Sequence, residues 1–533
     1  MADSGAELGT AYRLACREIA ERLAAHEVSD SAGITKLKKE ISRKYRLASI
    51  PRHSDVLKLS GEEAVKAQLK RKRMRTASGV LPVAVMTSPF ACPHGKCLMC
   101  PGGPTSAFAS PQSYVGYEPA AARAAQQGFE PYDQVRTRLR QLEEIGHEVA
   151  KVELILMGGT LTARPLSYQQ WFVSRCLAAL EDFGAEHGIT ICNTGITFET
   201  RPDYARDEEV DRMLALGATK LELGVQQVSD RILTAIQRGH SVSDSIMANR
   251  RARDSGLKVG FHVMLGLPGA TPEDDTAMFA TIFNDPSFRP DYLKIYPTLV
   301  VQGTKLYEQW QRGEYEPLQE DRAIEIIAAA KRLIPKWVRI QRIQRDIPAQ
   351  FIEAGVKKSN LRQLVLARLQ ETGERCRCIR CREAGLAQLA GRYAEERAVQ
   401  LLIERYEACG GTELFLSYED IKNDILIALL RLRFPYEPHR VELRNAAVVR
   451  DLHVYSEMVG LGERKEQSWQ HRGYGARLLR KAEEIATDAG YRKLAVMSGI
   501  GVREYYARLG YSREGPYMVK VLSVSGAADR GEP

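Results

Sequence analysis

The sequence contains no apolar run long enough to cross a bilayer, for which a helix needs about 18 to 20 residues. Its N-terminal segment also lacks the apolar stretch and small-residue cleavage site of a secretory signal. We therefore expect a protein with no membrane partner that works in the cytoplasm.

Cysteine is scarce, with ten in 533 residues, which excludes a disulfide scaffold for a chain of this length. Internal repeats and low-complexity tracts are also absent. Hydrophobic residues make up 44% and charged residues 27%, as in ordinary globular proteins. The length predicts two or three domains. Six of the cysteines gather in two short segments, and clustered thiols in the cytoplasm indicate metal sites.

The net charge of +9 is concentrated near the N-terminus. The basic residues concerned are Lys36, Lys38, Lys39, Arg43, Lys44, Arg46, Lys66, Lys70, Arg71, Lys72, Arg73 and Arg75. Such clusters attract polyanions, and a nucleic-acid backbone is the commonest one. A solvated helix face is the other interpretation.

Apolar runs typical of strands alternate with segments long enough for crossover helices. The runs lie at 80–86, 151–159, 194–200, 220–226, 258–269 and 292–301. This rhythm predicts an α/β fold with a parallel sheet, and six strands favour a partial (β/α)6 barrel, similar to part of a TIM barrel. We expect a basic segment at 1–78, the barrel at 79–310, a helical linker at 311–412, a second α/β domain at 413–523 and a flexible tail at 524–533.

The first cysteine cluster, Cys92, Cys97 and Cys100, directly follows the first predicted strand. Three thiolates on one loop can hold a metal centre, and plant-type ferredoxins with this spacing need a fourth cysteine, which is lacking nearby. A four-iron cluster held by three thiolates leaves one iron open to a small molecule. A zinc site and a set of redox thiols are the alternatives.

In the second domain, the segment QHRGYG opens a predicted helix after the strand DLHVYSEMV. Glycines there let backbone N–H groups face a phosphate. The pattern resembles the pyrophosphate loop of GNAT acetyltransferases, which bind acetyl-CoA. The resemblance assigns to this cofactor Asp451, Leu452, His453, Val454, Gln470, Arg472, Gly473, Tyr474, Gly475 and Ala476. Tyr505 and Tyr506 stand where the fold uses a tyrosine to protonate the leaving thiolate, and we favour Tyr506.

The second cysteine cluster, Cys376, Cys378 and Cys381, follows no predicted strand. Structural zinc sites take four ligands, so we expect zinc here, with His53 as a candidate fourth ligand. A set of reduced thiols is the alternative.

The first cluster, at the end of the first of several parallel strands, resembles that of the radical SAM superfamily. The resemblance implies a [4Fe-4S] cluster that binds S-adenosylmethionine. It implies that Gly158 and Gly159 contact that cofactor, although Thr160 stands where an acidic residue is common. Glu199 and Gln226 are further candidates for its binding. Lys294 is a candidate catalytic residue that could instead pair with a carboxylate.

A radical SAM unit followed by a GNAT unit resembles the catalytic subunits of the Elongator complex. The segments that carry this similarity include CPGGP, QSYVGYEP, MGGT, ETRPDY, LELGVQ, RGHSV, FRPDYLKIYPTLV, QRDIP, GVREYY and GPYMVK. The resemblance implies an enzyme that places a carboxymethyl group on C5 of the wobble uridine of tRNA. A radical formed from S-adenosylmethionine takes hydrogen from the acetyl methyl group, the carbon radical adds to uridine, and hydrolysis releases CoA.

The same resemblance implies that Lys151 faces acetyl-CoA and that the basic N-terminus grips the anticodon arm. An electron donor is required, and a homodimer or accessory subunits are compatible with the sequence. One alternative is a protein lysine acetyltransferase with a structural iron-sulfur cluster. Another is a tRNA-binding scaffold that only senses acetyl-CoA.

Overall fold

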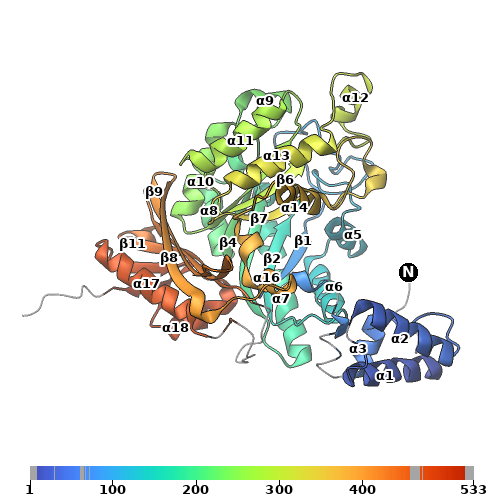
Figure 1. Cartoon of the computed structure of the whole chain (residues 1–533). Coiled ribbons are helices and arrows are strands. Elements are labelled where there is room, and N and C mark those ends of the chain that lie inside the picture. Colours follow the sequence, from blue (N-terminus) through green and yellow to red (C-terminus); the bar gives the residue numbers. More distant parts are fainter. Residues whose placement is uncertain are drawn as a thin grey trace, which may run out of the picture.

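A computed structural model describes residues 9–28, 30–60, 65, 68–70, 72–456, 469–470 and 472–522. The predicted tail at 524–533 and the basic residues Lys66 and Arg71 lie outside them. Three helices that lie entirely within the described N-terminal residues, together with Val65 and Leu69, form a small unit with its own apolar core (Figure 1). These helices are α1 (Thr10–Ala24), α2 (Ser31–Lys44) and α3 (His53–Ser60).

The central unit is a sheet of seven parallel strands in the order β1 to β7. The strands are β1 (Leu81–Met86), β2 (Lys151–Met157), β3 (Cys192–Thr200), β4 (Ala218–Gln226), β5 (Lys258–Leu265), β6 (Tyr292–Pro297) and β7 (Arg339–Ile343). β1 and β7 are the edges of the sheet, so the barrel is open. The predicted partial barrel is confirmed, with one strand more than the six expected.

Helices lie around this sheet (Figure 1). They are α5 (Pro119–Gln126), α6 (Pro131–Glu143), α7 (Leu166–His187), α8 (Asp207–Ala215), α9 (Asp230–Ala235), α10 (Val242–Asp254), α11 (Pro272–Asn284), α12 (Lys305–Gln311), α13 (Glu320–Leu333), α14 (Leu361–Glu371), α15 (Ile379–Arg382) and α16 (Ala384–Leu389). Local sequence explains where they begin. Thr271, for example, accepts a hydrogen bond from the backbone of Asp274 at the start of α11, and Pro272 occupies the first turn, where no N–H partner is needed.

The C-terminal unit is a mixed sheet in the order β13-β14-β12-β11-β10-β9-β8. Its elements are β8 (Val399–Ala408), β9 (Gly411–Asp420), β10 (Ile425–Phe434), β11 (Ala446–Val454), α17 (Tyr474–Asp488), β12 (Lys493–Val496), α18 (Arg503–Ala507), β13 (Ser512–Glu514) and β14 (Tyr517–Val521). The predicted second α/β domain is therefore present. No helix among the described residues is long and apolar enough to span a membrane.

Two strands differ from the helical linker that we expected at 311–412. β7 has the sequence RIQRI, and its polar side chains Arg339 and Gln341 line a cavity, so it shows no apolar run. β8 is an edge strand with many exposed side chains. Both strands escape detection because each buries little apolar surface.

A buried ionic network joins the two sheets. Arg450 of β11 donates to Asp291, which precedes β6, at 2.7 Å and to Glu413 of β9 at 2.8 Å. Arg253 of α10 donates to Glu413 at 2.9 Å. All four side chains are at most 1% exposed. Because buried charges need close partners, this network fixes the C-terminal sheet against the barrel.

Candidate functional site

A cavity of about 1340 Å³ is lined by residues of both units. The barrel contributes all three cysteines of the first cluster. The C-terminal unit contributes residues of β11, the start of α17, and the adjacent tyrosines Tyr505 and Tyr506. The predicted site residues that line it are Cys92, Cys97, Cys100, Lys151, Gly159, Glu199, Gln226, Lys294, Asp451, Leu452, His453, Val454, Gln470, Gly473, Tyr474, Gly475, Ala476, Tyr505 and Tyr506. The structure therefore brings most of the predicted residues to one space.

The first cysteine cluster lies on the loop after β1. His94 Nε2 lies 3.1 Å from Cys97 Sγ, and Arg238 Nη1 lies 3.7 Å from the same sulfur. Hydrogen bonds from Cys100 and His94, together with the charge of Arg238, lower the pKa of Cys97 to about 3. These contacts favour a thiolate at Cys97, whereas the hydrogen bond with Cys97 and burial raise the pKa of Cys100. All three sulfur atoms must lose their protons to ligate a metal cluster.

Gly158 and Gly159, which follow β2, differ in the space around them. A side chain on Gly158 would meet Thr87 Oγ1 at 1.9 Å, so packing alone requires a glycine there. Gly159 also has a positive φ, of 95°, but a Cβ there would meet nothing within 4 Å. Thr160 Oγ1 lies 3.6 Å from Cys92 Sγ. Gly159 therefore leaves open space beside the cysteines, where a ligand can approach the backbone.

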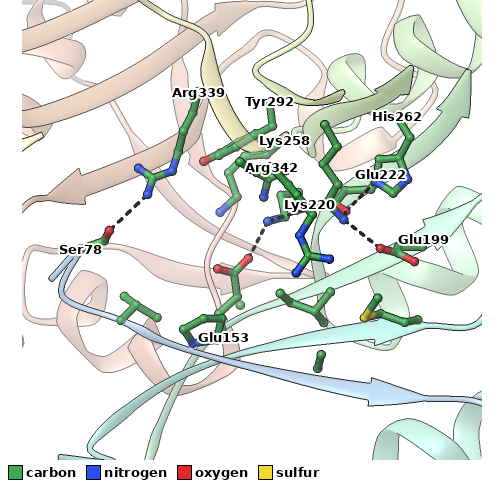
Figure 2. A pocket seen from close by; sticks show the side chains of 18 of the residues that line it. Ser78, Glu153, Glu199, Lys220, Glu222, Lys258, His262, Tyr292, Arg339 and Arg342 are labelled. Carbon is green, nitrogen blue, oxygen red and sulfur yellow. Dashed lines mark hydrogen bonds and ion pairs between the residues drawn. The ribbon is translucent and has the colours of Figure 1, made fainter. Parts of the chain in front are cut away.

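Acidic and basic side chains lie together on the cavity wall formed by β3, β4, β5 and β6. Lys294 donates to Glu199 at 2.9 Å and pairs with Glu222, and His262 Nε2 lies 2.9 Å from Glu222. Figure 2 shows Glu199, Glu222 and His262 close together. These three groups have the spacing of a metal site, but the Lys294 ammonium already supplies the cation between the carboxylates. Burial opposes its charge, yet the two carboxylates raise the pKa of Lys294 well above its usual range.

A further ion pair on the cavity wall involves two residues that we did not predict from the sequence. Lys220 pairs with Glu153 at 2.8 Å, as Figure 2 shows, and both line the cavity. The sequence contains a signal for this pair, because the charged residues at alternate positions in KVELILM and KLELGVQ must lie on one face of the sheet. Gln226, at the end of β4, has a φ of 68° and also lines the cavity.

β11 supplies an open strand edge to the cavity. Its last pairing with β12 is Val449 with Val496, and β11 continues to Val454. On that edge the backbone from Asp451 to Val454 is free of pairing with β12. Tyr292 donates to Asp451 at 2.9 Å. His453 Nε2 lies 2.7 Å from the carbonyl oxygen of Ser78, which gives its side chain a structural contact.

The start of α17 faces the same cavity. Gly473 precedes the helix with a φ of 81°, and a side chain there would meet nothing within 4 Å. Lys151 Nζ donates to Gln470 Oε1 at 2.9 Å. Arg472, which we expected to bind the cofactor, does not line the cavity and pairs with Glu396 at 3.3 Å. It lies on the exposed side of the loop.

Tyr505 and Tyr506 both line the cavity from α18. Tyr505 is 40% exposed, and its hydroxyl lies near Gly475. Tyr506 is 6% exposed, and burial raises its pKa above the ordinary value, with a further contribution from the charge of Asp451. Tyr506 is therefore protonated at neutral pH and can act as a hydrogen-bond donor.

The second cysteine cluster is separate from the cavity. The sulfur atoms of Cys376, Cys378 and Cys381 all lie within 4.8 Å of one another. His53 is not part of this group. Its Nδ1 lies 3.3 Å from the carbonyl oxygen of Leu69, because α3 packs in the N-terminal unit. Among the described residues no fourth ligand joins the three thiols.

Four family descriptions match successive parts of the chain. The ELP3 N-terminal domain matches 12–77, the Radical SAM superfamily matches 86–280, the Radical_SAM C-terminal domain matches 290–371 and the acetyltransferase (GNAT) family matches 386–511.

Similar proteins span nearly the whole chain. A tRNA uridine(34) acetyltransferase of Methanocaldococcus infernus is 51% identical over 92% of this chain and 96% of its own length. Elongator complex protein 3 of Schizosaccharomyces pombe is 43% identical over 95% of this chain and 98% of its own length. The solved structure of M. infernus Elp3 with residues 1–46 deleted has a TM-score of 0.73 and 47% identity, covering 84% of this chain and all of that one.

Proposed function

Since the chain belongs to the Elongator complex protein 3 family, we propose that it is a cytoplasmic tRNA uridine(34) acetyltransferase that carboxymethylates C5 of the wobble uridine. The observation that carries this proposal is the single cavity shared by the cysteine loop and the acetyl-CoA strand β11. A reaction that joins two cofactors needs both reacting groups in one space.

We assign Cys92, Cys97 and Cys100 as ligands of a [4Fe-4S] cluster. The donor set fits, because three thiols of one loop line the cavity and Gly159 leaves open space on the same wall. When bound there with S-adenosylmethionine, such a cluster supplies a carbon-centred radical that can take hydrogen from the acetyl methyl group. An external one-electron donor has to feed this site. We assign Glu199 and Gln226, which line the cavity, to the polar groups of S-adenosylmethionine.

The C-terminal unit is assigned to acetyl-CoA. The backbone N–H groups at Gly473–Ala476 face the pyrophosphate at the positive end of the α17 dipole. The open edge of β11 at 451–454 binds the pantetheine arm by backbone hydrogen bonds. Tyr506 gives its proton to the CoA thiolate when the thioester is hydrolysed. Lys151 and Gln470 contact the cofactor from opposite units.

The polar wall formed by Glu222, His262 and Lys294 lines the same cavity as the residues assigned to the two cofactors. It offers donors and acceptors to the edge of a uracil base, whose O2, N3–H and O4 need such partners. We propose that the base enters here, while the N-terminal helices bind the anticodon arm. The basic charge of that unit suits an RNA backbone.

The second cluster is assigned to structural zinc, held by Cys376, Cys378 and Cys381 with a fourth ligand from outside the group. Elemental analysis should find about one zinc per chain. Cys378→Ser should lose this zinc and keep the iron, whereas Cys409→Ser, a buried single cysteine, should keep both metals. Full zinc content in Cys378→Ser would refute the assignment.

The deciding experiment is mass spectrometry of nucleosides from tRNA incubated anaerobically with the reconstituted chain, S-adenosylmethionine, a reductant and methyl-labelled acetyl-CoA. We expect label in a 5-carboxymethyluridine-type nucleoside, and none with Cys97→Ala. Cys409→Ala, which changes a buried cysteine outside both clusters, serves as the control. Label on protein lysines alone would instead establish a protein acetyltransferase.

A further inference from the structure

Three arginines from three elements meet at the cavity beside the edge strand β1. Arg75 ends the short helix η1 (Arg73–Arg75), Arg123 lies on α5 and Arg138 lies on α6. All three line the cavity, and α5 and α6 both pack on β1. Arg138 is only 9% exposed, and the other two are half-buried. Positive charge is therefore collected at the open side of the barrel.

These three charges have no acidic partner among the residues that the structure describes. Arg138 donates one hydrogen bond, to the neutral Gln141 at 3.2 Å. Asp346 attracts Arg75 from a distance, but it pairs with Arg342 at 2.8 Å. The group differs in this respect from the buried Arg450, which has two carboxylate partners.

The three arginines also repel one another. Burial, followed by the positive charges of Arg75 and Arg123, lowers the pKa of Arg138 to about 10. The charge of Arg75 likewise adds to burial in lowering the pKa of Arg123. Holding unpaired charges together in a partly desolvated place costs free energy. An anion with several oxygen atoms would offset that cost, and guanidinium groups match phosphate oxygens in pairs.

We propose that Arg75, Arg123 and Arg138 bind one backbone phosphate of the RNA next to the nucleotide whose base enters the cavity. This inference rests on the proposed function and adds a residue-level subsite to it. The phosphates of acetyl-CoA have a different place, at the start of α17 in the C-terminal unit. The arginines belong to the barrel and to the segment that links it to the basic N-terminal helices. A nucleotide turned out of its loop needs its backbone held, and phosphate contacts do this.

The test measures RNA binding by fluorescence anisotropy, using an anticodon stem-loop and the full reconstituted chain over a range of salt concentrations. Arg138→Gln and Arg123→Gln should each weaken binding about tenfold, the usual effect of losing one charge-assisted contact. The slope of the logarithm of the binding constant against the logarithm of the salt concentration should become shallower by about 0.7 to 0.9, the value for one lost phosphate contact. Arg140→Gln, an exposed position on the same helix, should change neither.

Two further measurements distinguish a phosphate subsite for RNA from one for CoA and from a purely structural cluster. Acetyl-CoA affinity by calorimetry should be unchanged, and a loss there with RNA binding intact would assign the arginines to CoA and overturn the proposal. Unchanged RNA affinity in both variants would overturn it as well. The RNA-free variants should melt no lower than the wild type, since each loses a repulsion. Because binding is measured without turnover, absence of uridine modification would refute the enzyme assignment and leave this subsite standing.

Discussion

Lys151 Nζ lies 2.9 Å from Gln470 Oε1, although the two residues are 319 positions apart in the sequence. Lys151 begins β2 of the barrel, and Gln470 precedes α17 of the C-terminal unit. This hydrogen bond therefore links the two units at the wall of the cavity, where the phosphates and thioester of acetyl-CoA would lie.

Lys151→Met should weaken acetyl-CoA binding about tenfold, because it removes one charge-assisted hydrogen bond to the cofactor. Isothermal titration calorimetry measures this directly. Lys481→Met, on α17 and paired with Glu484 at the surface, is the matched control. Equal affinities for Lys151→Met and the wild type would remove Lys151 from the binding site.

Tyr506→Phe should lower the rate of CoA release about a hundredfold, the lower range for loss of a general acid, with little change in KM for acetyl-CoA. The reason is that Tyr506 lines the cavity in its protonated form, and we assign its hydroxyl to the sulfur of the leaving CoA. Tyr505→Phe changes the adjacent, more exposed ring and should stay within a few-fold of the wild type. A thiol-detection assay checks both, and the reverse ranking would transfer the role to Tyr505.

Asp291→Ala should lower the free energy of unfolding by about 3 to 5 kcal/mol, because it leaves buried arginines without their carboxylate. Arg450 and Arg431 both pair with Asp291. The midpoint of urea denaturation gives the effect. Asp488→Ala, an exposed position on α17, should change stability by less than about 0.5 kcal/mol. A similar small effect for Asp291→Ala would show that the network contributes little.

The raised pKa of the buried Asp275 side chain should make the stability of the protein depend on pH. Burial raises its pKa from 3.8 to about 7, so the folded chain keeps a proton that the unfolded chain has lost. The contribution of Asp275 to the free energy of unfolding is fully present below pH 3.8, and it is lost as the pH rises to about 7. Between pH 5.5 and 7 the loss should reach about 1 to 2 kcal/mol. Melting curves of Asp275→Asn should lack this component, and parallel pH profiles for the two proteins would contradict it.

Much of the fold follows from sequence because the barrel strands are buried and give clear apolar runs. The cysteine loop after β1 and the glycines before α17 were likewise predictable, since each depends on local spacing. Contacts between segments that are distant in the sequence could not be predicted in this way. A carboxylate partner for Lys294 was one of the predicted alternatives, but its two partners Glu199 and Glu222, like the placement of His53 away from the second cluster, depend on how distant segments pack. Single residues carry no sequence signal for such pairings.

The buried network between the sheets makes the two units inseparable. A fragment ending before β8 would leave Asp291 and Arg253 without Arg450 and Glu413. The complementary fragment would present Arg431 and Arg450 on a bare sheet face. Each half of the chain, produced alone, should therefore be poorly soluble, and the two halves should be recovered in solution only when they are produced together.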